Sequence, residues 1–500
     1  MKDEALQAGT PPKPKWMCTP LTTYKVALNN ERCINCGLCA SLCPYGVFAV
    51  REGYNRMALP DGRKCLGPAC EKNSFYCVKN CPTEALSVKA DPNCESLGDV
   101  RWTNHLLLDT YKQSETRVYA DNEGKGASGG GFDKLRIAYP DDGSLKPEYL
   151  EEISTGIELN RRSAGPRITI PLPLYGGGMS FGSVSLNVML ARAMAAKAMN
   201  TFTCTGEGGY PEQLTPYKDH IITQIATGLF GVREETIQRA RLVEFKYAQG
   251  AKPGLGGHLL ADKVTPTVAA MREALPWNSL FSPFPFHSVY SVEDHKKHVD
   301  WIRAVNPDAL VSIKVSTPTD VDMVAVGSYY AGANIVHLDG GYGGTGAAPD
   351  IAKKNIALPI EYAIPKVHRF LLAEGVREEV TLMVSGGIRS VQDALKAIAL
   401  GADGVVVGTS DLVALGCVRC GNCESGRGCP YGIATTDPEL SQLINPQWGA
   451  DRIINMYAAW RERMVRTLSR LGLKSIGELR GRADFLLHEE YGRGVRIDAE

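Results

Sequence analysis

The chain has 500 residues, and its 55 lysines and arginines balance its 55 aspartates and glutamates. This balance excludes a strong overall attraction to nucleic acid or to an anionic membrane surface. The longest apolar stretches fall short of the ~20 residues that cross a bilayer, and the N-terminal residues lack the apolar core of a signal peptide. We therefore expect a cytoplasmic protein without membrane insertion, built from one large domain and at least one smaller one.

Fifteen cysteines divide the sequence into regions. Ten precede residue 95, four lie in the segment 417–429, and Cys204 stands alone. Such tight clusters in a cytosolic chain indicate metal ligation and not disulfides. Cys204 lies in an apolar run, so we interpret it as a buried small hydrophobe.

The first cysteine-rich region, residues 1–95, is predicted to be a ferredoxin-like α+β domain with two [4Fe-4S] clusters. Its first motif ends in Cys-Pro and has the spacing in which three thiolates hold one cluster and the fourth holds another. The second motif is a stretched copy with the same ending. A zinc site with four thiolates is the alternative. The spacing assigns Cys33, Cys36, Cys39 and Cys81 to one cluster, and Cys43, Cys65, Cys70 and Cys77 to the other.

Residues 96–152 are predicted to be a linker. The run from 116 to 142 is polar and rich in glycine, as flexible or ligand-contacting segments are. Its glycines Gly124, Gly126 and Gly129 satisfy G-x-G-x-x-G, but no strand-to-helix context surrounds them. We therefore expect no nicotinamide site there, and electrons enter through iron and sulfur.

Residues 153–416 are predicted to form a (β/α)8 barrel, the TIM-barrel fold of the α/β class. Short apolar runs alternate with amphipathic stretches, which is the pattern of parallel strands joined by crossover helices. About eight such units over some 250 residues fit a closed barrel better than an open sheet. The strand-like runs include 168–175, 201–206, 280–284, 310–315, 334–341, 380–387 and 404–409.

Polar residues and glycines mark the ends of several predicted strands, including Lys246, Lys314 and Asp339. The C-terminal strand ends of such a barrel build its active site. The last two strands end in Ser-Gly-Gly at 385–387 and Gly-Thr at 408–409. Loops at these places present backbone N–H groups to a phosphate, and only glycine permits that close approach. The pattern indicates a phosphorylated cofactor.

Single titratable residues in the barrel are open to two interpretations. His287 and His337 are either catalytic acids or hydrogen-bonded structural groups. Lys314 and Lys252 are better candidates for function, because a lysine at the mouth of a barrel is costly to place without an anionic partner.

A third cysteine group follows the last predicted strand, in the segment 417–430. Four thiolates at this spacing can hold another iron–sulfur cluster, which would be the last electron carrier before the barrel. A structural zinc loop is the alternative. Residues 431–500 are predicted to be a helical extension that packs on the barrel. The four cysteines are Cys417, Cys420, Cys423 and Cys429.

Six long strings, five in the barrel region and one in the C-terminal extension, carry a family resemblance. They are YGGGMSFGSVS (175–185), TGEGGY (205–210), KYAQGAKPGLGGHL (246–259), SPFPFHSVYSVED (282–294), DGGYGGTGAAP (339–349) and GLKSIGELRGRADFL (472–486). Together they resemble the FMN-binding synthase domain of glutamate synthases. With two ferredoxin-type motifs in front, the layout resembles the short archaeal-type form.

The resemblance implies an FMN on the barrel, an adjacent [3Fe-4S] cluster, and reductive amination of 2-oxoglutarate to glutamate through 2-iminoglutarate. It implies that Lys252, Arg272 and His258 bind the substrate. It implies that Lys314, Glu207 and Lys252 are catalytic, and a lysine beside N1 and the C2 oxygen of a flavin stabilises the reduced anion. The residues implied to contact FMN are Gly178, Met179, Ser180, Gln249, Lys314, Ser385, Gly386, Gly387, Gly408 and Thr409.

Three departures from the family pattern concern the substrate and the third cluster. Leu255 replaces an acidic residue and His258 an amide, while Phe286 replaces a histidine and Ser288 an aspartate. The pocket is thereby predicted to be less polar, which favours another 2-oxo acid or an amine other than ammonia. A fourth cysteine, Cys420, allows a [4Fe-4S] cluster at the third site in place of [3Fe-4S].

The nitrogen source and the partners follow from the same resemblance. The chain begins Met1-Lys2-Asp3 and not with the catalytic cysteine of a glutaminase domain, so we expect free ammonia, an amine, or ammonia delivered by a partner subunit. The expected electron donor is a ferredoxin or a flavoprotein subunit that oxidises NAD(P)H, within an oligomer or a larger complex. Two alternatives stay open: an electron-transfer subunit without amination activity, and transfer onto an alkylamine as in N-methylglutamate synthases.

Overall fold

The computed structural model describes residues 22–51, 53, 55–68, 70, 76–119, 131–140, 147–344, 348–349, 351–353, 355–424, 427–489 and 495–496. These residues form two compact units, a smaller one within Cys18–Leu108 and a larger one within Asp109–Glu500. Much of the glycine-rich part of the predicted linker, with Gly124, Gly126 and Gly129, lies outside the described residues.

The smaller unit is a two-stranded antiparallel sheet with cysteine-bearing loops around it. β1 (Tyr24–Leu28) pairs with β2 (Leu86–Ala90) along its whole length. Among its described residues, one small buried apolar cluster is formed by Val47, Phe48 and Leu86, against which five cysteines of the two motifs pack. Small domains with so little core usually need disulfides or metal for stability. Its helices are α1 (Leu38–Leu42), the 3-10 turn η1 (Gly62–Lys64) and α2 (Pro92–Glu95).

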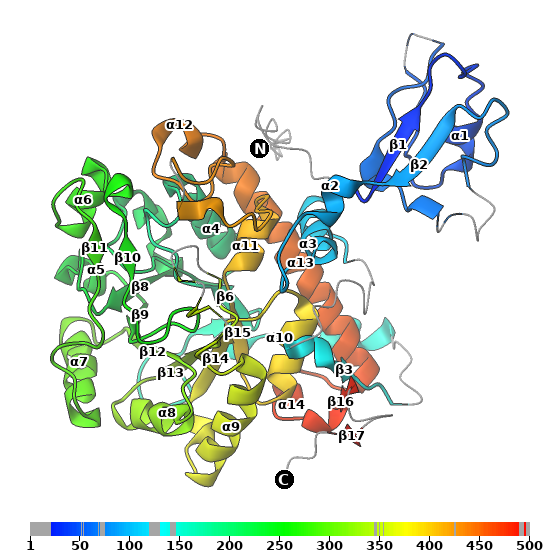
Figure 1. The fold of residues 1–500 in the computed structure, drawn as a ribbon. Helices are drawn as coiled ribbons and strands as arrows, with labels where there is room; N and C mark the ends of the chain where they lie inside the picture. The colour runs from blue at the N-terminus through cyan, green and yellow to red at the C-terminus, as the bar shows by residue number, and fades with distance from the viewer. Residues whose placement is uncertain are drawn as a thin grey trace, which may run out of the picture. The chain divides into compact units, whose positions relative to one another are not determined.

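The larger unit is built around a closed barrel of eight parallel strands (Figure 1), which confirms the predicted (β/α)8 fold. The longer strands are buried on both faces, as parallel strands covered by helices are. In barrel order the strands are β6 (Leu174–Gly176), β7 (Thr203–Cys204), β8 (Ile221–Ala226), β9 (Leu242–Lys246), β12 (Leu310–Ser316), β13 (Ile335–Asp339), β14 (Thr381–Ser385) and β15 (Gly404–Val407).

Helical segments connect successive strands and cover the barrel. Several begin at a serine whose side chain accepts a hydrogen bond from a backbone N–H of the first turn, namely Ser185, Ser291 and Ser390. The segments are α4 (Leu186–Ala198), the 3-10 helix η5 (Glu212–His220), α5 (Glu234–Gln238), α7 (Val292–Val305), α8 (Val321–Tyr330), α9 (Ile360–Ala373), α10 (Val391–Ala399) and α11 (Thr409–Ala414).

One predicted strand is wrong and one barrel strand was not predicted. The run 280–284 is not part of the barrel, because Leu280–Phe281 forms β11 and pairs antiparallel with β10 (His258–Leu259). This pair belongs to an excursion, residues 247–291, that separates β9 from β12 and also contains α6 (Pro266–Arg272). The third barrel strand is β8, whose six residues are all buried between β7 and β9. A short apolar run alone does not distinguish these two places.

Segments that flank the barrel pack together beside it. α13 (Pro446–Leu471) lies in the predicted helical extension and packs on α4. Trp460 of α13 donates a 3.1 Å hydrogen bond to Gln113 of α3 (Asn104–Thr116). The remaining elements are β3 (Leu135–Ile137), which pairs with β16 (Leu486–His488), β17 (Val495–Arg496), the pair β4 (Ile157–Glu158) and β5 (Thr169–Ile170), α12 (Pro438–Ser441) and α14 (Ile476–Leu479).

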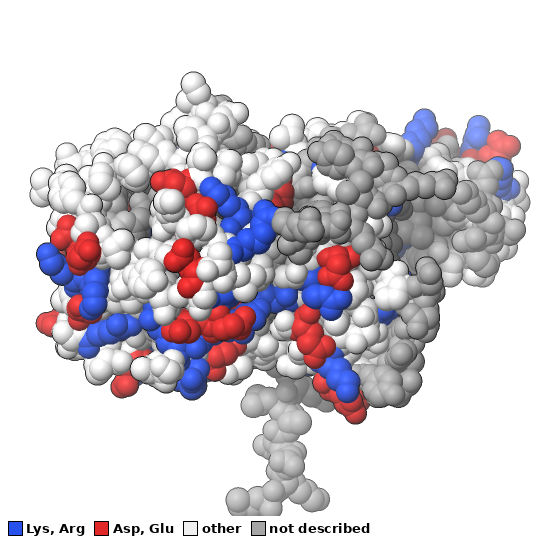
Figure 2. Space-filling model, turned by 90° about the horizontal axis from the view of Figure 1, so that it is seen from below, with Lys and Arg blue, Asp and Glu red and all other residues white. Residues whose placement is uncertain are grey.

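On the face drawn in Figure 2, acidic and basic side chains are interspersed. This agrees with the balance of charges along the sequence. Among the described helices, none combines the length and the apolar character needed to cross a bilayer.

Candidate functional site

An ammonium group stands at the carboxyl ends of the barrel strands. Lys314 of β12 lies beside Asp339 of β13, with 3.3 Å between Nζ and Oδ2. The hydroxyl of Ser385 donates a 2.6 Å hydrogen bond to Oδ1, and the backbone N–H of Gly250 donates one of 3.0 Å to Oδ2. Burial opposes the charge, but Asp339 and Glu244 outweigh it and raise the pKa of Lys314 above its ordinary value. Lys314 is therefore a fixed cation.

Glycines follow the last two strands, where the sequence predicts a phosphate. Gly386 has φ 83° and Gly387 φ 144°, in the region that glycine favours. A Cβ at Gly386 would lie 2.3 Å from the carbonyl oxygen of Gly340, whereas a Cβ at Gly408 would meet nothing within 4 Å. The backbone beside Thr409 thus borders open space. An open glycine backbone near a fixed cation fits the phosphate and ring of FMN.

The residues after β6 form another wall. Gly178 and Met179 are half-buried and Ser180 is buried. A Cβ at Gly178 would lie 2.7 Å from Nε2 of Gln224, so only glycine fits there. The hydroxyl of Ser180 accepts a 3.2 Å hydrogen bond from Nη2 of Arg272. This bond ties the β6 loop to the excursion, which carries the predicted substrate residues.

Three cations surround one carboxylate near the barrel mouth, and we call them the cation cluster: Lys246, Lys252 and Arg272 around Glu207. Oε2 of Glu207 lies 3.5 Å from Nζ of Lys246 and accepts a 3.3 Å hydrogen bond from Ser282. Lys252 and Arg272 are 3% and 4% exposed, and Nε of Arg272 is buried without a hydrogen-bond partner. Three positive charges against one negative leave these four described side chains with two uncompensated positive charges, because Glu424, which also acts on Lys252, is paired with Lys263.

The charges of the cation cluster change the pKa values of its members. Burial works against ionisation of Glu207, but Lys246, Arg272 and Lys252 together lower its pKa below the ordinary value. Burial first, and then Lys246, lower the pKa of Lys252 to about 8. Burial also lowers the pKa of Arg272. The cation cluster therefore disfavours the protonated forms of Lys252 and Arg272, and an anion that binds there would favour them.

The excursion approaches the cation cluster at its glycines. A Cβ at Gly257 would lie 1.6 Å from Oε1 of Glu207, so only glycine allows this approach. The next residue, His258, is half-buried and its ring stacks on Phe281 with centroids 6.0 Å apart. Burial and then the charge of Lys252 lower the pKa of His258, which favours the neutral ring. Gln249 is half-buried at the beginning of the excursion.

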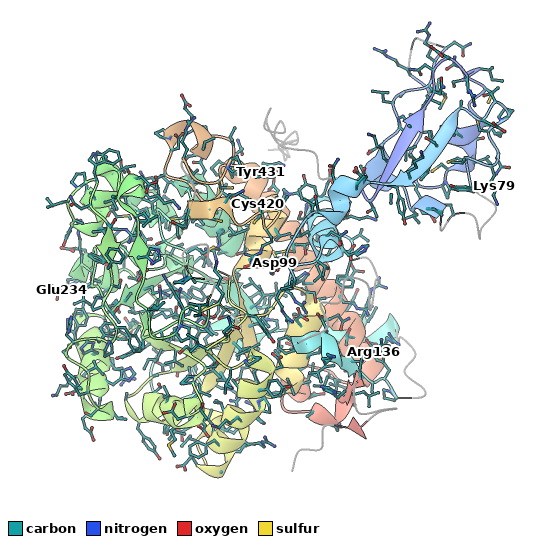
Figure 3. All side chains as sticks on the ribbon, in the orientation of Figure 1. Lys79, Asp99, Arg136, Glu234, Cys420 and Tyr431 are labelled. Atoms are coloured by element: carbon teal, nitrogen blue, oxygen red, sulfur yellow. The ribbon has the colours of Figure 1, made fainter. Side chains whose placement is uncertain are left out.

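The third cysteine group lies in the loop between α11 and α12, where Cys420 and Tyr431 are marked in Figure 3. Cys423 contributes to a raised pKa of Cys417, and Cys429 contributes to a raised pKa of Cys423, so these three thiols lie close together. Burial raises the pKa of Cys417 to about 12. A buried thiol with so high a pKa becomes a thiolate when a metal binds it.

Lys263 of the excursion connects it to this loop. Its Nζ donates a 2.6 Å hydrogen bond to the carbonyl oxygen of Cys423 and lies 3.1 Å from Oε2 of Glu424. The Lys263 side chain is only 4% exposed. One buried cation therefore joins the third cysteine group to the segment that carries the predicted substrate residues.

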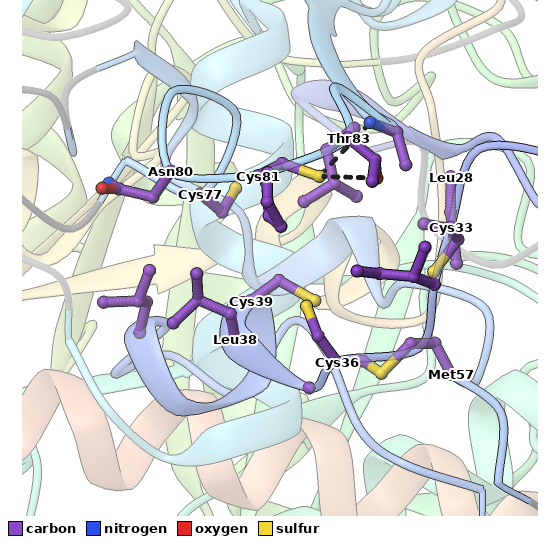
Figure 4. Close-up of a pocket in the computed structure, with 16 residues that line it drawn as sticks. Leu28, Cys33, Cys36, Leu38, Cys39, Met57, Cys77, Asn80, Cys81 and Thr83 are labelled. Carbon is purple, nitrogen blue, oxygen red and sulfur yellow. Dashed lines mark hydrogen bonds between the residues drawn. The ribbon is translucent and has the colours of Figure 1, made fainter.

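In the smaller unit, the first predicted set of thiols lines one pocket (Figure 4), together with Cys77 of the other set. Although burial opposes it, backbone N–H groups of Thr83 and Ala85 lower the pKa of Cys81. Such N–H···S bonds favour the thiolate that binds iron. The four thiols of the set are Cys33, Cys36, Cys39 and Cys81.

The second set comes together around the last cysteine of the first motif. Cys43 affects the ionisation of Cys65, Cys70 and Cys77, and burial is the largest cause that raises their pKa values. Cys77 also lies near Cys39 of the first set, so the crossed assignment stays a prediction. Within the described residues, no three His, Cys, Asp or Glu side chains are placed to hold one metal ion. A cubane cluster instead distributes its four thiolates over four irons.

Several residues lie where the sequence argument did not place them. Lys246 and Ser282 both contact Glu207. The sequence indicated Lys246 only as the end of a strand, and it indicated no role for Ser282. Phe286 is 2% exposed and packs in an aromatic cluster with Tyr247, at a centroid distance of 4.8 Å. Ser288 contacts His298. The position of Ser282 at the start of the string SPFPFHSVYS was the one available signal.

Comparisons with known proteins agree with this architecture. The conserved region in glutamate synthase matches residues 132–474, and the 4Fe-4S binding domain matches residues 26–48, which confirms the iron–sulfur motif there. The archaeal-type glutamate synthase (NADPH) of Thermotoga sp. strain RQ2 is 36% identical and aligns over 93% of this chain and 95% of its own length. The archaeal glutamate synthase (NADPH) of Methanocaldococcus jannaschii is 37% identical over 95% of this chain and 96% of its own.

Among solved structures, mandelate oxidase with benzoyl-formic acid has a TM-score of 0.44 at 17% identity, over 75% of this chain and 96% of that one. The family assignment therefore rests on sequence similarity. Given the extent of the matched conserved region and of both relatives, the chain belongs to the glutamate synthase family.

Proposed function

We propose that the protein makes glutamate from 2-oxoglutarate and ammonia, using electrons from its iron–sulfur clusters and an FMN in the barrel. The observation that carries this proposal is the cation cluster, which has two uncompensated positive charges in a buried place. A dicarboxylate supplies two negative charges, and fixed cations orient it. The names of the archaeal-type relatives point to the same reaction.

FMN is held in this proposal by the barrel mouth. Gly386, Gly387, Gly408 and Thr409 offer backbone and hydroxyl groups to its phosphate, in the open space beside Gly408. The ring side is provided by Gly178, Met179, Ser180, Gln249, Lys314 and Ser385. When bound, FMN accepts single electrons from the clusters and delivers a hydride to the substrate.

The side chains of the cation cluster then divide the work on the substrate. Lys252 and Arg272 bind its carboxylates, and His258 borders the same pocket. Ionised Glu207, whose lowered pKa keeps it unprotonated before the substrate arrives, accepts a proton from ammonia as the nitrogen adds to the 2-oxo carbon. It then returns this proton to the hydroxyl group, which leaves as water when the imine forms. Lys314 stays protonated and stabilises negative charge on the reduced ring.

The thiols supply the electron path. Two [4Fe-4S] clusters in the smaller unit take the crossed sets described above, and a [3Fe-4S] or [4Fe-4S] cluster takes the third cysteine group. A ferredoxin or an NAD(P)H-oxidising flavoprotein subunit reduces them, and the names of the relatives specify NADPH. Ammonia is taken free or from a partner subunit.

The test uses the anaerobically purified protein, reduced by dithionite and then mixed with candidate substrates. We expect flavin reoxidation with 2-oxoglutarate and ammonia together, and little with either alone. The variant Lys252→Met removes one of the two spare charges and is expected to raise the 2-oxoglutarate concentration for half-maximal rate by about 100-fold. Reoxidation only with an alkylamine would assign amine transfer, and no response to any 2-oxo acid would assign an electron-transfer subunit.

A further inference from the structure

The interior of the barrel below Lys314 contains a buried polar network. TIM-barrel interiors are usually filled by layers of apolar side chains, so a polar layer needs an explanation. Its members lie on neighbouring strands from β8 to β14, and all are less than one-tenth exposed. They are Gln224, Glu244, Ser312, Lys314, His337, Asp339 and Ser385.

The network forms a continuous line of hydrogen bonds through His337. Nδ1 of His337 lies 2.9 Å from Oε2 of Glu244, and its Nε2 lies 2.8 Å from Oγ of Ser385. Ser385 in turn donates its hydroxyl hydrogen to Asp339, at 2.6 Å, and Asp339 pairs with Lys314 at 3.3 Å. The line therefore runs from a carboxylate through an imidazole and a hydroxyl to a carboxylate and an ammonium.

The donors and acceptors along this line fix where the protons are. A serine has one hydroxyl hydrogen, and Ser385 gives it to the acceptor Asp339, so Ser385 can only accept from Nε2 of His337. At the other end, an ionised Glu244 has no hydrogen to give, so it accepts from Nδ1. Both ring nitrogens of His337 then carry a hydrogen.

Glu244 is ionised because its other contacts are donors. Gln224 donates a 2.7 Å hydrogen bond to Oε1, and Ser312 donates one of 3.1 Å to Oε2. Burial opposes the charge, but Lys314 and the amide of Gln224, independently of His337, act to lower the pKa of Glu244. Four charges alternate along the line, negative and positive in turn, and sum to zero among buried side chains.

We propose that His337 carries a hydrogen on both ring nitrogens, as an imidazolium, and is a positioning residue that holds Asp339, and through it Lys314, at the mouth of the barrel. The charged groups that face it are Glu244 from β9, Lys314 from β12 and Asp339 from its own strand. The consequence for the cofactor rests on the proposed function: without the imidazolium, Glu244 is an uncompensated negative charge beneath the flavin.

The protonation state is measured directly in the full-length protein with 15N-labelled histidine. At pH 7 we expect two N–H correlations from the His337 ring, assigned by their loss in His337→Asn. A neutral ring with one unprotonated nitrogen overturns the proposal. His220→Gln is the control for assignment, because Nδ1 of His220 lies 2.9 Å from a backbone carbonyl oxygen, that of Thr201, and not from a carboxylate. This measurement needs no FMN, so it stands apart from the proposed function.

Two variants test the line itself. In Glu244→Gln the counter-charge is gone, and we expect the His337 ring to become neutral; a ring that keeps both hydrogens contradicts the role of Glu244. In the FMN-loaded enzyme, His337→Asn is expected to favour oxidised over reduced FMN by about tenfold, or about 30 mV for two electrons, while His220→Gln leaves the potential unchanged. An unchanged potential in His337→Asn overturns the positioning role. If Glu244→Gln does not fold, the spectrum of the wild-type protein still shows whether both ring nitrogens of His337 carry a hydrogen.

Discussion

Raising the pH from about 7 to about 9 is expected to weaken 2-oxoglutarate binding, because binding requires a protonated Lys252. Burial and Lys246 lower the pKa of Lys252 to about 8 in the free protein. At pH ~7 most of this lysine carries its proton, and at pH ~9 about one-tenth does. A ligand that binds only the protonated form therefore loses about tenfold in affinity, or about 1.4 kcal/mol, across this interval.

The assay is calorimetric titration of the anaerobic protein with 2-oxoglutarate in the absence of ammonia, at half-unit steps of pH. The matched control is Lys252→Arg, whose guanidinium keeps its proton throughout. We expect a flat profile in this variant between about pH 7 and 9 and a break near pH 8 in the wild type. A wild-type dissociation constant that stays constant to pH ~9.5 would refute the assignment of Lys252 as a carboxylate ligand.

The same lysine affects the stability of the free protein, with a sign that can be worked out. Its folded pKa of about 8 lies below its ordinary value of 10.5, so between these values the unfolded chain binds more protons. The free energy of unfolding therefore rises with pH in that window. The buried charge costs about 3 kcal/mol below pH ~8, at about 1.4 kcal/mol for each pKa unit. Lys252→Met should be more stable than the wild type at pH ~7 by up to about 3 kcal/mol, and this difference should shrink toward pH ~10 in denaturant melts.

Three further predictions concern other contacts. Gly257→Ala places a Cβ 1.6 Å from Oε1 of Glu207. We therefore expect a loss of about 1–3 kcal/mol in unfolding free energy and a turnover at least ~100-fold lower. Unchanged steady-state rates would show that the reaction does not need the Glu207 carboxylate at this position. Lys263→Met removes the bond to the Cys423 carbonyl and should cost about 2 kcal/mol, visible as faster iron loss to a chelator, while equal rates would contradict this role. Cys43→Ser should lower the iron content by about four per chain without loss of the first cluster's spectrum; loss of both clusters would contradict the crossed assignment.

Much of the fold could be predicted because its signals are local. The cysteine spacings act through ligand geometry over a few residues, and the apolar runs of β12, β13 and β14 are recognisable one at a time. β8 was not predicted because its apolar run is interrupted by Thr223 and Gln224 and follows directly on a 3-10 helix that contains Pro216. The run 280–284 looked equally strand-like, and only the closure of the barrel distinguishes the two.

The candidate site was less predictable because its parts meet only in three dimensions. Lys246 ends a barrel strand, whereas Lys252 and Arg272 lie at two places in the excursion. No sequence period relates them, and the two spare charges exist only once they surround Glu207. The role of His337 was open for the same reason, because its hydrogen-bond partners come from β9 and β14.

In the function that we propose, electrons from thiolate-bound iron reach a flavin that reduces an imine of 2-oxoglutarate. Its most direct test is a single turnover of the fully reduced protein with 2-oxoglutarate and 15N-ammonium, followed by mass spectrometry of the products. We predict that 15N-glutamate forms in step with flavin reoxidation and that its yield is strongly reduced in Lys252→Met. Flavin reoxidation without labelled glutamate, or no reoxidation at all, would contradict it.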